Sequence, residues 1–277
     1  MNHIKTFFLM ALLTVILLLA GEMLGGPTGL TFALGLALVL NFFAYWFSDK
    51  IAVTMTRSKQ VTEKEAPDVY RALKELTHKE GMPMPRVYIM PSEQPNAFAA
   101  GRNPDRSVVS VTQGLQKMLS YEELKGVLAH ELAHIRNRDI LISTIAAVMV
   151  GALTFIARIG MWGMIFGGRD NENPLGAIIQ LVALIILPIA ALLIRMAVSR
   201  TREYHADATG AELAGGPHGL ASALEKMERY AKGKPMKVNE AASHMFIINP
   251  LSAKGMASLF STHPPIRQRV EKLRQMS

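Results

Sequence analysis

Two histidines one helical turn apart stand in the middle of the chain, with a glutamate beside the first of them. His130, Glu131 and His134 form the pattern H-E-x-x-H within SYEELKGVLAHELAHIRNRD. Ser120 and Glu123 have the spacing of a capping box, which predicts that a helix begins there and carries the motif. On a helix, two imidazoles at positions i and i+4 can bind one zinc ion, and the neighbouring carboxylate can reach a metal-bound water. The spacing favours a metal-dependent hydrolase that still needs a third ligand.

A pair of acidic residues supplies the candidate third ligand. Glu203 and Asp207 lie four residues apart in SRTREYHADATG, so on a helix they share one face. Glu203 can ligate the metal, and Asp207 can accept the free ring N–H of a ligand histidine. The alternative is the solvated acidic face of a surface helix. The choice depends on whether the fold brings this segment to the histidines.

The composition limits the possible ligands to histidine and carboxylates. The 277-residue chain contains no cysteine, which excludes a disulfide framework, a thiolate metal site and a cysteine nucleophile. Hydrophobic residues make up 50% of the chain and its mean hydropathy is +0.21, so it is more apolar than an ordinary soluble domain of this length. We therefore expect membrane-spanning segments.

Four apolar runs could cross a bilayer. They cover residues 7–21, 30–47, 140–157 and 175–198. The short connector GEMLGGPTG joins the first two into a predicted helical hairpin, since each run approaches the ~20 residues that a transmembrane helix needs. The second run ends in the aromatic cluster YWF, which is common at a membrane interface. For the last two runs, burial in a soluble core is the alternative.

The positive charges predict the orientation of these spans. Lysine and arginine precede the first and third spans and follow the second and fourth, whereas the first external loop has neither. By the positive-inside rule, both termini and the central polar segment lie in the cytosol. The net charge of +8 then reflects topology, and we expect no nucleic-acid partner. The third and fourth spans would return the chain to one membrane surface, which favours Glu203 as the third ligand.

The polar segments predict an α+β fold that is mainly α. Residues 67–80 have apolar positions at helical spacing, with Pro67 near the start and Gly81 as a stop. Residues 86–90 and 107–112 are strand-like, β-branched stretches. The sequence between these strands reads as a loop with a short extended piece, and the part after the fourth span predicts several helices.

The predicted organisation has four segments along the chain. A transmembrane hairpin occupies residues 1–48 and a cytosolic catalytic segment with the H-E-x-x-H helix occupies residues 49–139. A second pair of transmembrane helices follows at 140–198, and a second cytosolic catalytic segment with the third ligand ends the chain at 199–277. The two catalytic segments must meet for the metal site to form.

The motifs HELAH, SRTREYHAD and STHPPIRQR occur in this order and resemble those of the HtpX group of bacterial membrane metalloproteases, relatives of the CAAX prenyl proteases. The resemblance runs along almost the whole chain. It implies a multi-pass protein of the bacterial inner membrane, with about four transmembrane helices in the lipid bilayer and a cytosolic zincin-like catalytic domain. Its implied activity is a zinc metalloendopeptidase that degrades damaged or misassembled membrane proteins and unfolded polypeptides.

The resemblance also implies roles for individual residues. One zinc ion would be held by His130, His134 and Glu203. Glu131 would be the general base, and Asp207 would orient His130.

Two further positions are implied by the resemblance. Asn96 in PNAFAAG matches a segment whose extended backbone lines the substrate cleft; the alternative is an ordinary turn asparagine after Pro95. His263 in HPP matches a histidine near the scissile carbonyl; the alternative is a residue at the entry of a helix that begins with the prolines. Both alternatives stay open from the sequence.

Two rival functions also stay open. An intramembrane metalloprotease would carry its metal motif inside an apolar span, whereas here the charged stretch IRNRD follows the motif. A membrane scaffold with a structural zinc ion would need a fourth protein ligand, for which His205 and His263 are the candidates. The sequence predicts neither the individual substrates nor the oligomeric state.

Overall fold

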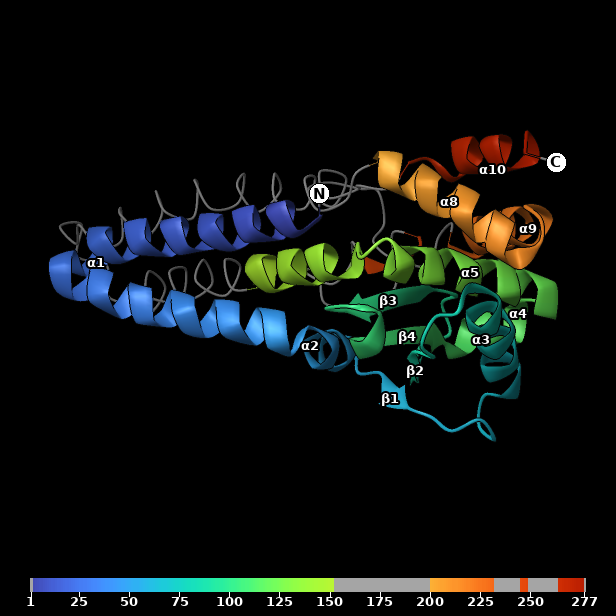
Figure 1. The fold of residues 1–277 in the computed structure, drawn as a ribbon, viewed down its shortest axis with the longest axis horizontal. Coiled ribbons are helices and arrows are strands. Elements are labelled where there is room, and N and C mark those ends of the chain that lie inside the picture. The colour runs from blue at the N-terminus through green and yellow to red at the C-terminus, as the bar shows by residue number, and fades with distance from the viewer. Residues whose placement is uncertain (1, 152–199, 232–244, 249–263, 277) are drawn as a thin grey trace, which may run out of the picture.

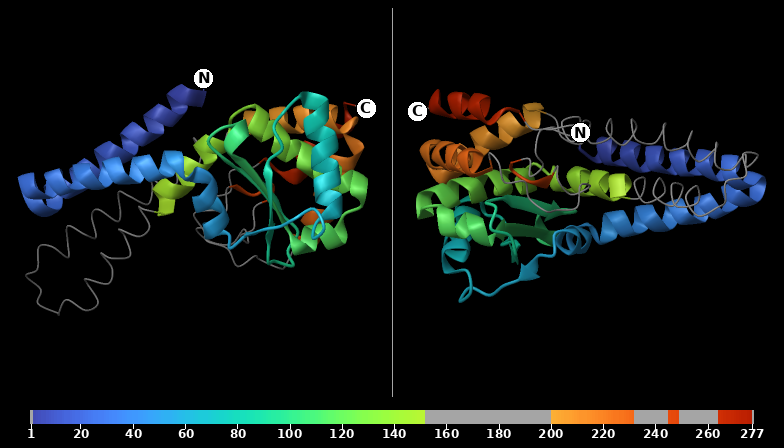
Figure 2. Two further views of the ribbon diagram at one scale, coloured as in Figure 1. Left: turned by 60° about the horizontal axis from the view of Figure 1, so that its bottom comes forward. Right: turned by 180° about the vertical axis from the view of Figure 1, so that it is seen from behind.

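The computed structural model describes residues 2–151, 200–231, 245–248 and 264–276. These residues form a long helical hairpin and, at its open end, a body in which helices cover a four-stranded sheet (Figures 1 and 2). The element order confirms the predicted α+β fold with mainly helical content.

Helix α1 (Asn2–Trp46) is the hairpin. Its two arms, Ile4–Glu22 and Gly25–Trp46, are long and apolar enough to cross a membrane. The break between them lies at Gly25 and Gly26, which have non-helical backbone angles. The predicted hairpin is present, but its turn is shorter than the connector GEMLGGPTG, because two glycines suffice to reverse the chain and their neighbours continue the helices.

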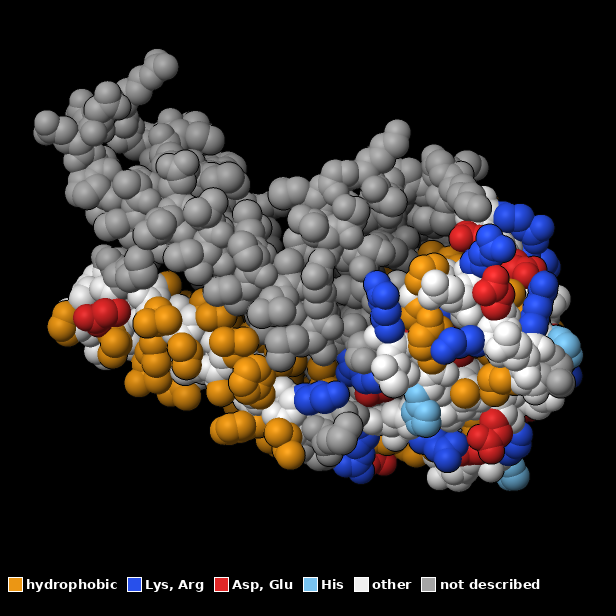
Figure 3. Space-filling view, turned by 90° about the horizontal axis from the view of Figure 1, so that it is seen from above, with side chains coloured by type: hydrophobic (Ala, Val, Ile, Leu, Met, Phe, Trp, Pro, Cys, Tyr) orange, Lys and Arg blue, Asp and Glu red, His pale blue; other side chains and the backbone are white. Residues whose placement is uncertain are grey.

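The outer surface of the hairpin is apolar. Phe7 is 74% exposed, Phe32 is 76% exposed and Trp46 is 50% exposed. Figure 3 shows hydrophobic side chains along the hairpin, whereas the charged side chains gather on the body. An apolar surface of this extent is unfavourable in water and is typical of contact with lipid or another protein.

The third apolar run begins as a helix, Ile140–Gly151, that packs against the hairpin. Buried side chains from this helix and from both arms of α1 form one cluster, including Leu13, Ala37 and Ile145. The remainder of this run and the whole fourth run lie outside the described residues. Four transmembrane helices therefore remain a prediction.

The body contains a sheet in the order β1-β2-β4-β3. Its strands are β1 (Lys59–Gln60), β2 (Arg86–Met90), β3 (Ala97–Gly101) and β4 (Ser107–Thr112). Strand β2 pairs with β4 in parallel, and β3 pairs with β4 in antiparallel at the edge of the sheet. The two predicted strands are confirmed with their bounds. The short extended piece expected in the loop between them is β3, whose small, buried residues form a full ladder with β4.

The body also contains helices that pack on the sheet and on one another, with α5 in a central position. They are α2 (Ser48–Met55), α3 (Pro67–Glu80), α4 (Gln113–Met118), α5 (Tyr121–Arg136), α8 (Arg200–Ala214), α9 (His218–Ala231) and α10 (Ile266–Arg274), with a 3₁₀ turn, η1 (Pro104–Arg106). Helix α5 contacts β3, α3, α8 and α9. The predicted helix from Pro67 is confirmed, and Gly81 ends it in the left-handed conformation.

The start of α5 is fixed by the predicted capping box. The Ser120 side chain accepts a hydrogen bond from the Glu123 backbone N–H, and the Glu123 carboxylate accepts one from the Ser120 N–H. Glu123 also accepts hydrogen bonds from Ser222 and Lys226 of α9. Hydrogen bonds therefore fix the first turn of α5 internally and also connect it to α9, a helix that is distant in sequence.

Candidate metal centre

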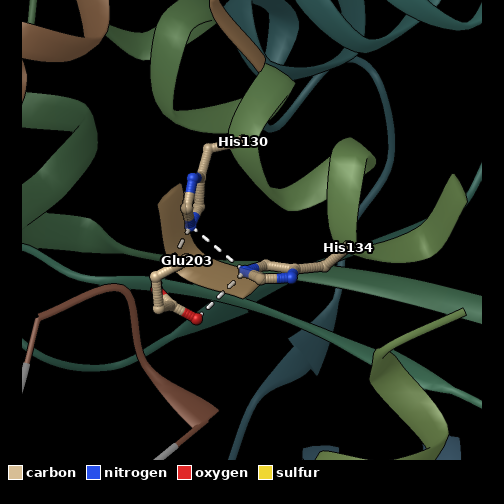
Figure 4. A group of neighbouring side chains, drawn as sticks. All are labelled: His130, His134 and Glu203. Atoms are coloured by element: carbon tan, nitrogen blue, oxygen red, sulfur yellow. Dashed lines mark hydrogen bonds and ion pairs between the residues drawn. The ribbon is translucent and has the colours of Figure 1, made fainter. Parts of the chain in front are cut away.

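Three side chains from α5 and α8 converge in the body. The Nε2 atoms of His130 and His134 are 3.2 Å apart. The Glu203 carboxylate lies 3.5 Å from His134 Nε2 and 3.8 Å from His130 Nε2. Figure 4 shows both imidazoles and the carboxylate directed toward one point. Among the described residues, these three form the group that could hold a metal ion.

Helix packing brings Glu203 to the histidines. Gly210 of α8 lies against the backbone of α5 at His130, and a Cβ added at Gly210 would be 2.9 Å from His130 Cα. A side chain there would push the two helices apart. The packing therefore depends on a glycine three residues beyond Asp207, and it sets the distance between the two motifs.

The three residues fit a zinc ion. Imidazole nitrogen and carboxylate oxygen are ordinary zinc ligands, and around a tetrahedral ion with bonds of about 2.0–2.1 Å two donor atoms are about 3.3 Å apart. The 3.2 Å and 3.5 Å separations at His134 are close to this value, and the 3.8 Å separation between His130 and Glu203 is somewhat longer. Three protein donors would leave a position for water or substrate.

His130 is backed by a buried ion pair. Its Nδ1 lies 3.0 Å from Asp207 Oδ1, although the ring is not aligned for a straight hydrogen bond. Both oxygens of Asp207 accept hydrogen bonds from Arg269 of α10, at 2.9 and 2.7 Å. Burial alone would raise the pKa of Asp207, but the Arg269 guanidinium holds it well below its usual range. Asp207 is therefore a charged partner of His130.

His134 has a different carboxylate behind it. Asp139 Oδ2 lies 3.4 Å from His134 Nδ1, and Asp139 Oδ1 lies 3.6 Å from Arg202 of α8. Asp139 belongs to no motif that the sequence alone indicates. It lies five residues after His134, just past the end of α5. There a turn, with Arg138 at a φ of 58°, directs the chain back toward the histidine.

These surroundings move the pKa values of the two histidines in opposite directions. Burial lowers the pKa of His130 to about 4, and the contact with Asp207 only partly offsets this effect. Burial would also lower the pKa of His134, but the hydrogen bond with Asp139 and the nearby carboxylates raise it to about 8. The negative charge of the site thus acts mainly on His134.

Glu131 lies beside the metal group and is also buried. Burial is the main reason that its pKa rises to about 7. The Ala99 backbone N–H of β3 donates a hydrogen bond to its carboxylate and acts in the opposite direction. A carboxylate with a pKa near neutrality is suited to take up and release a proton.

A cleft of about 440 Å³ opens beside these residues. Its polar wall includes the three metal-group residues together with Glu131, Asp139 and Arg202. Its other walls come from Ala99 of β3, from Ile140 and from the segment Met245–Ile247. One side of the cleft is therefore charged and contains the metal group and Glu131, and another side is apolar.

The remaining predicted positions fall in different places. Asn96 is fully buried and does not line the cleft; its side chain bonds to the backbone of Ile248 instead, at 2.8 and 3.3 Å. The turn-asparagine alternative is wrong, because this amide anchors a segment distant in sequence. His205 is exposed and lies outside the metal group, so it does not provide a fourth ligand. His263 lies outside the described residues.

Sequence comparisons place the chain among known peptidases. The sequence profile of peptidase family M48 matches residues 63–277. The chain is 53% identical to a protease HtpX homolog from Desulfatibacillum aliphaticivorans, over 98% of this chain and 89% of that relative. It is also 53% identical to an HtpX homolog from Pelotomaculum thermopropionicum, over 100% of both chains.

A solved structure has the same fold. The crystal structure of Ste24p from S. mikatae matches 98% of this chain with a TM-score of 0.54 and 20% identity. The chain spans 65% of the length of Ste24p. Members of family M48 are zinc metallopeptidases, which agrees with the donor set found between α5 and α8. The profile covers most of the chain and the relatives match it end to end, so the chain belongs to peptidase family M48 and is a metallopeptidase of the HtpX group.

Proposed function

We propose that this protein is a membrane-anchored zinc metalloendopeptidase that hydrolyses peptide bonds of misfolded or damaged membrane proteins at the cytosolic face of the bacterial inner membrane. The observation that carries the catalytic part is the convergence of His130, His134 and Glu203 beside the buried Glu131. The quality-control role is supported by the likeness to protease HtpX homologs.

The contact between the hairpin and the body supports a site close to the membrane surface. Arg102, which follows β3, lies with its guanidinium 4.2 Å from the ring centre of Trp46 at the end of α1. Helix α2 continues from the hairpin and contacts β3. Since tryptophan and arginine are both favoured at the membrane–water interface, the edge of the sheet would lie near the lipid headgroups. Substrates leaving the bilayer would reach it directly.

The residues of the chain can carry out hydrolysis with one metal ion. A bound zinc ion would polarise the scissile carbonyl and acidify a water molecule. Glu131 would take the proton of the attacking water and pass it to the leaving amine. Asp207 and Asp139 would hold the rings of His130 and His134 in the ligating orientation.

The edge of β3 offers the substrate a backbone partner. Because the Thr112 N–H donates to the Asn96 carbonyl, the backbone groups of alternate residues of β3 face β4 and those between them face outward. By this alternation Ala99, in the cleft wall, directs both backbone groups away from the sheet: its N–H donates to the Glu131 carboxylate, and its C=O can accept from a substrate N–H. An extended substrate could pair there and lie across the metal group.

The test compares cleavage of an unfolded protein by detergent-purified wild type and Glu131→Gln, each with a measured zinc content. We expect both to bind zinc, with the variant at least about 10²-fold slower because it lacks the base. Glu122→Gln makes the same chemical change at an exposed position of α5 and should cleave normally. A chelator should stop the wild type.

Other results would refute parts of the assignment. Normal cleavage by Glu131→Gln would contradict the role of Glu131. Stoichiometric zinc in a wild type that cleaves neither unfolded nor membrane-embedded proteins would favour a binding or scaffold function.

A further inference from the structure

The segment Met245–Ile248 is fixed across one end of the β3 edge. The Ile247 N–H donates to the Ala97 carbonyl at 3.1 Å, and the Ile247 carbonyl accepts from Arg269 at 3.0 Å. Asn96 accepts from the Ile248 N–H and donates to its carbonyl. The backbone of this segment is therefore held by both neighbouring elements, β3 and α10.

This anchoring limits where a substrate can pair with β3. The outward carbonyl of Ala97 is already bonded to Ile247. Ala99 and Gly101 are the next outward-facing residues along the strand, and Ala99 lines the cleft while Ala97 does not. An extended substrate that pairs with Ala99 would thus meet Met245–Ile248 at one end, beside the metal group.

The side chains that the substrate would meet there are apolar. Phe246 is fully buried and packs edge-on against Phe98, with ring centroids 5.5 Å apart. Met245 is 8% exposed and lines the cleft, as does Ile140 at the start of the helix after Asp139. Phe246 is held by a strand residue, so this wall is preformed rather than shaped by the ligand.

The charged groups of the cleft do not favour a charged substrate side chain. Among the described residues that line the cleft, Arg202 is a permanent cation, and Asp139 lies 3.6 Å from it. Glu131 and Glu203 would be engaged with the water and the metal. A lysine or glutamate side chain placed against Met245 would lose its hydration to apolar neighbours.

We propose that Met245, Phe246 and Ile140 form an apolar specificity pocket that selects an apolar side chain at a residue next to the scissile bond. The proposal rests on the proposed peptidase function and names the substrate class of that site. Such a preference suits segments that are normally buried in a membrane or a protein core and become accessible when a protein is damaged. Filling an apolar pocket discriminates by about 10- to 200-fold per methylene group.

The experiment measures kcat/KM of the zinc-loaded, full-length protein on quenched fluorescent peptides that are identical except at the two residues flanking the cleaved bond. Each position carries alanine, leucine, phenylalanine, glutamate or lysine in turn. At one of the two positions, wild type should cleave the leucine peptide at least about tenfold faster than the alanine, glutamate and lysine peptides.

Met245→Ala should lower the leucine-to-alanine ratio about tenfold and raise the phenylalanine-to-leucine ratio, because the pocket becomes larger. Ile140→Val removes one methylene group from another wall and should shift the ratios in the same direction by less. It provides a second reading if Met245→Ala does not fold. Met276→Ala makes the same chemical change at a residue that is 49% exposed and should leave all ratios unchanged.

The outcomes separate the two proposals. If wild type cleaves none of these peptides and no unfolded protein, the peptidase function fails and the pocket fails with it. If wild type cleaves in a Glu131-dependent way but shows equal rates on all peptides, or prefers glutamate or lysine, the pocket alone is refuted. Unchanged ratios in both folded pocket variants would refute it as well.

Discussion

The two histidines of the site lie on one helix and have contrasting surroundings. The His130 side chain is 1% exposed, and its partner Asp207 is held by two hydrogen bonds from the fully buried Arg269. The His134 side chain is 16% exposed, and its partner Asp139 lies at 3.4 Å with Arg202 a further 3.6 Å away. We refer to these as the inner and outer sides of the metal group.

The contrast shows how the site can be rigid and still admit a substrate. The inner side joins three helices, α5, α8 and α10, through a buried charge network that would hold its shape whether or not a ligand is bound. The outer side faces the cleft and the start of the helix from Ile140, so it can adjust as a water molecule or substrate enters. The following predictions test this difference, beginning with the largest effect.

Removal of Arg269 should cause the largest loss of stability. Arg269→Met leaves the charge of Asp207 buried without its main partner and frees the Ile247 carbonyl. Breaking a buried pair in this way costs about 3–5 kcal/mol. Hydrogen exchange of the α8 and α10 amides would measure this loss as a lower opening free energy.

The matched change on the outer side is Arg202→Met. The Arg202 side chain is 14% exposed and its contact with Asp139 is longer, at 3.6 Å, so we expect a smaller loss than for Arg269→Met in the same measurement. Equal losses in the two variants would contradict the distinction between a fixed inner side and an adjustable outer side.

Removing the charge of Asp207 should weaken zinc binding more than removing the charge of Asp139. Asparagine at position 207 or 139 keeps the size of the side chain and removes the charge that faces a histidine. Loss of such a partner typically weakens metal binding 10- to 100-fold. We expect Asp207→Asn near the upper end, because Arg269 fixes that carboxylate, and Asp139→Asn near the lower end.

Competition with a chromogenic chelator would measure both affinities. Asp105→Asn changes an exposed aspartate of the body and should bind zinc like wild type. A larger loss for Asp139→Asn than for Asp207→Asn would show that the outer partner, and not the inner one, controls the metal.

The sequence predicted the parts of the site that depend on local spacing. The capping box, the histidine pair on α5, and Glu203 and Asp207 on one face of α8 all follow from intervals of three or four residues. The strands at 86–90 and 107–112 follow from β-branched composition in the same way. Such patterns act within one element and need no knowledge of the fold.

The sequence did not predict the partners that depend on long-range packing. Arg269 stands in a charged helix, where arginine is usually exposed, and its long-range contacts with Asp207 and with the Ile247 carbonyl explain its burial. For strand β3 the sequence predicts only a short extended piece without bounds, because the stability of this strand comes from pairing with β4 rather than from strand-forming side chains. Asn96 likewise has its main partner at Ile248, 152 residues later.

The smallest predicted effect concerns Glu123 in the first turn of α5, the helix that carries both histidines. Burial alone would raise the pKa of Glu123, but hydrogen bonds from Lys226 and Ser222 outweigh it and the pKa is lowered in the folded protein. Glu123 therefore contributes stability above its unfolded pKa of about 4.5, and the contribution is lost as the pH falls through the lower folded value. Neutral pH gives the full effect.

Two substitutions separate the charge of Glu123 from its capping role. Glu123→Gln can still accept the Ser120 N–H, so it should cost less than about 1 kcal/mol at pH 7 and nothing below the folded pKa. Glu123→Ala also loses the cap and should cost about 0.5–2 kcal/mol more at every pH. Denaturant unfolding of chelator-treated protein across this pH range would measure both, without a contribution from metal loss. If the glutamine variant lost the same stability at every pH, the charge of Glu123 would not be what joins α5 to α9.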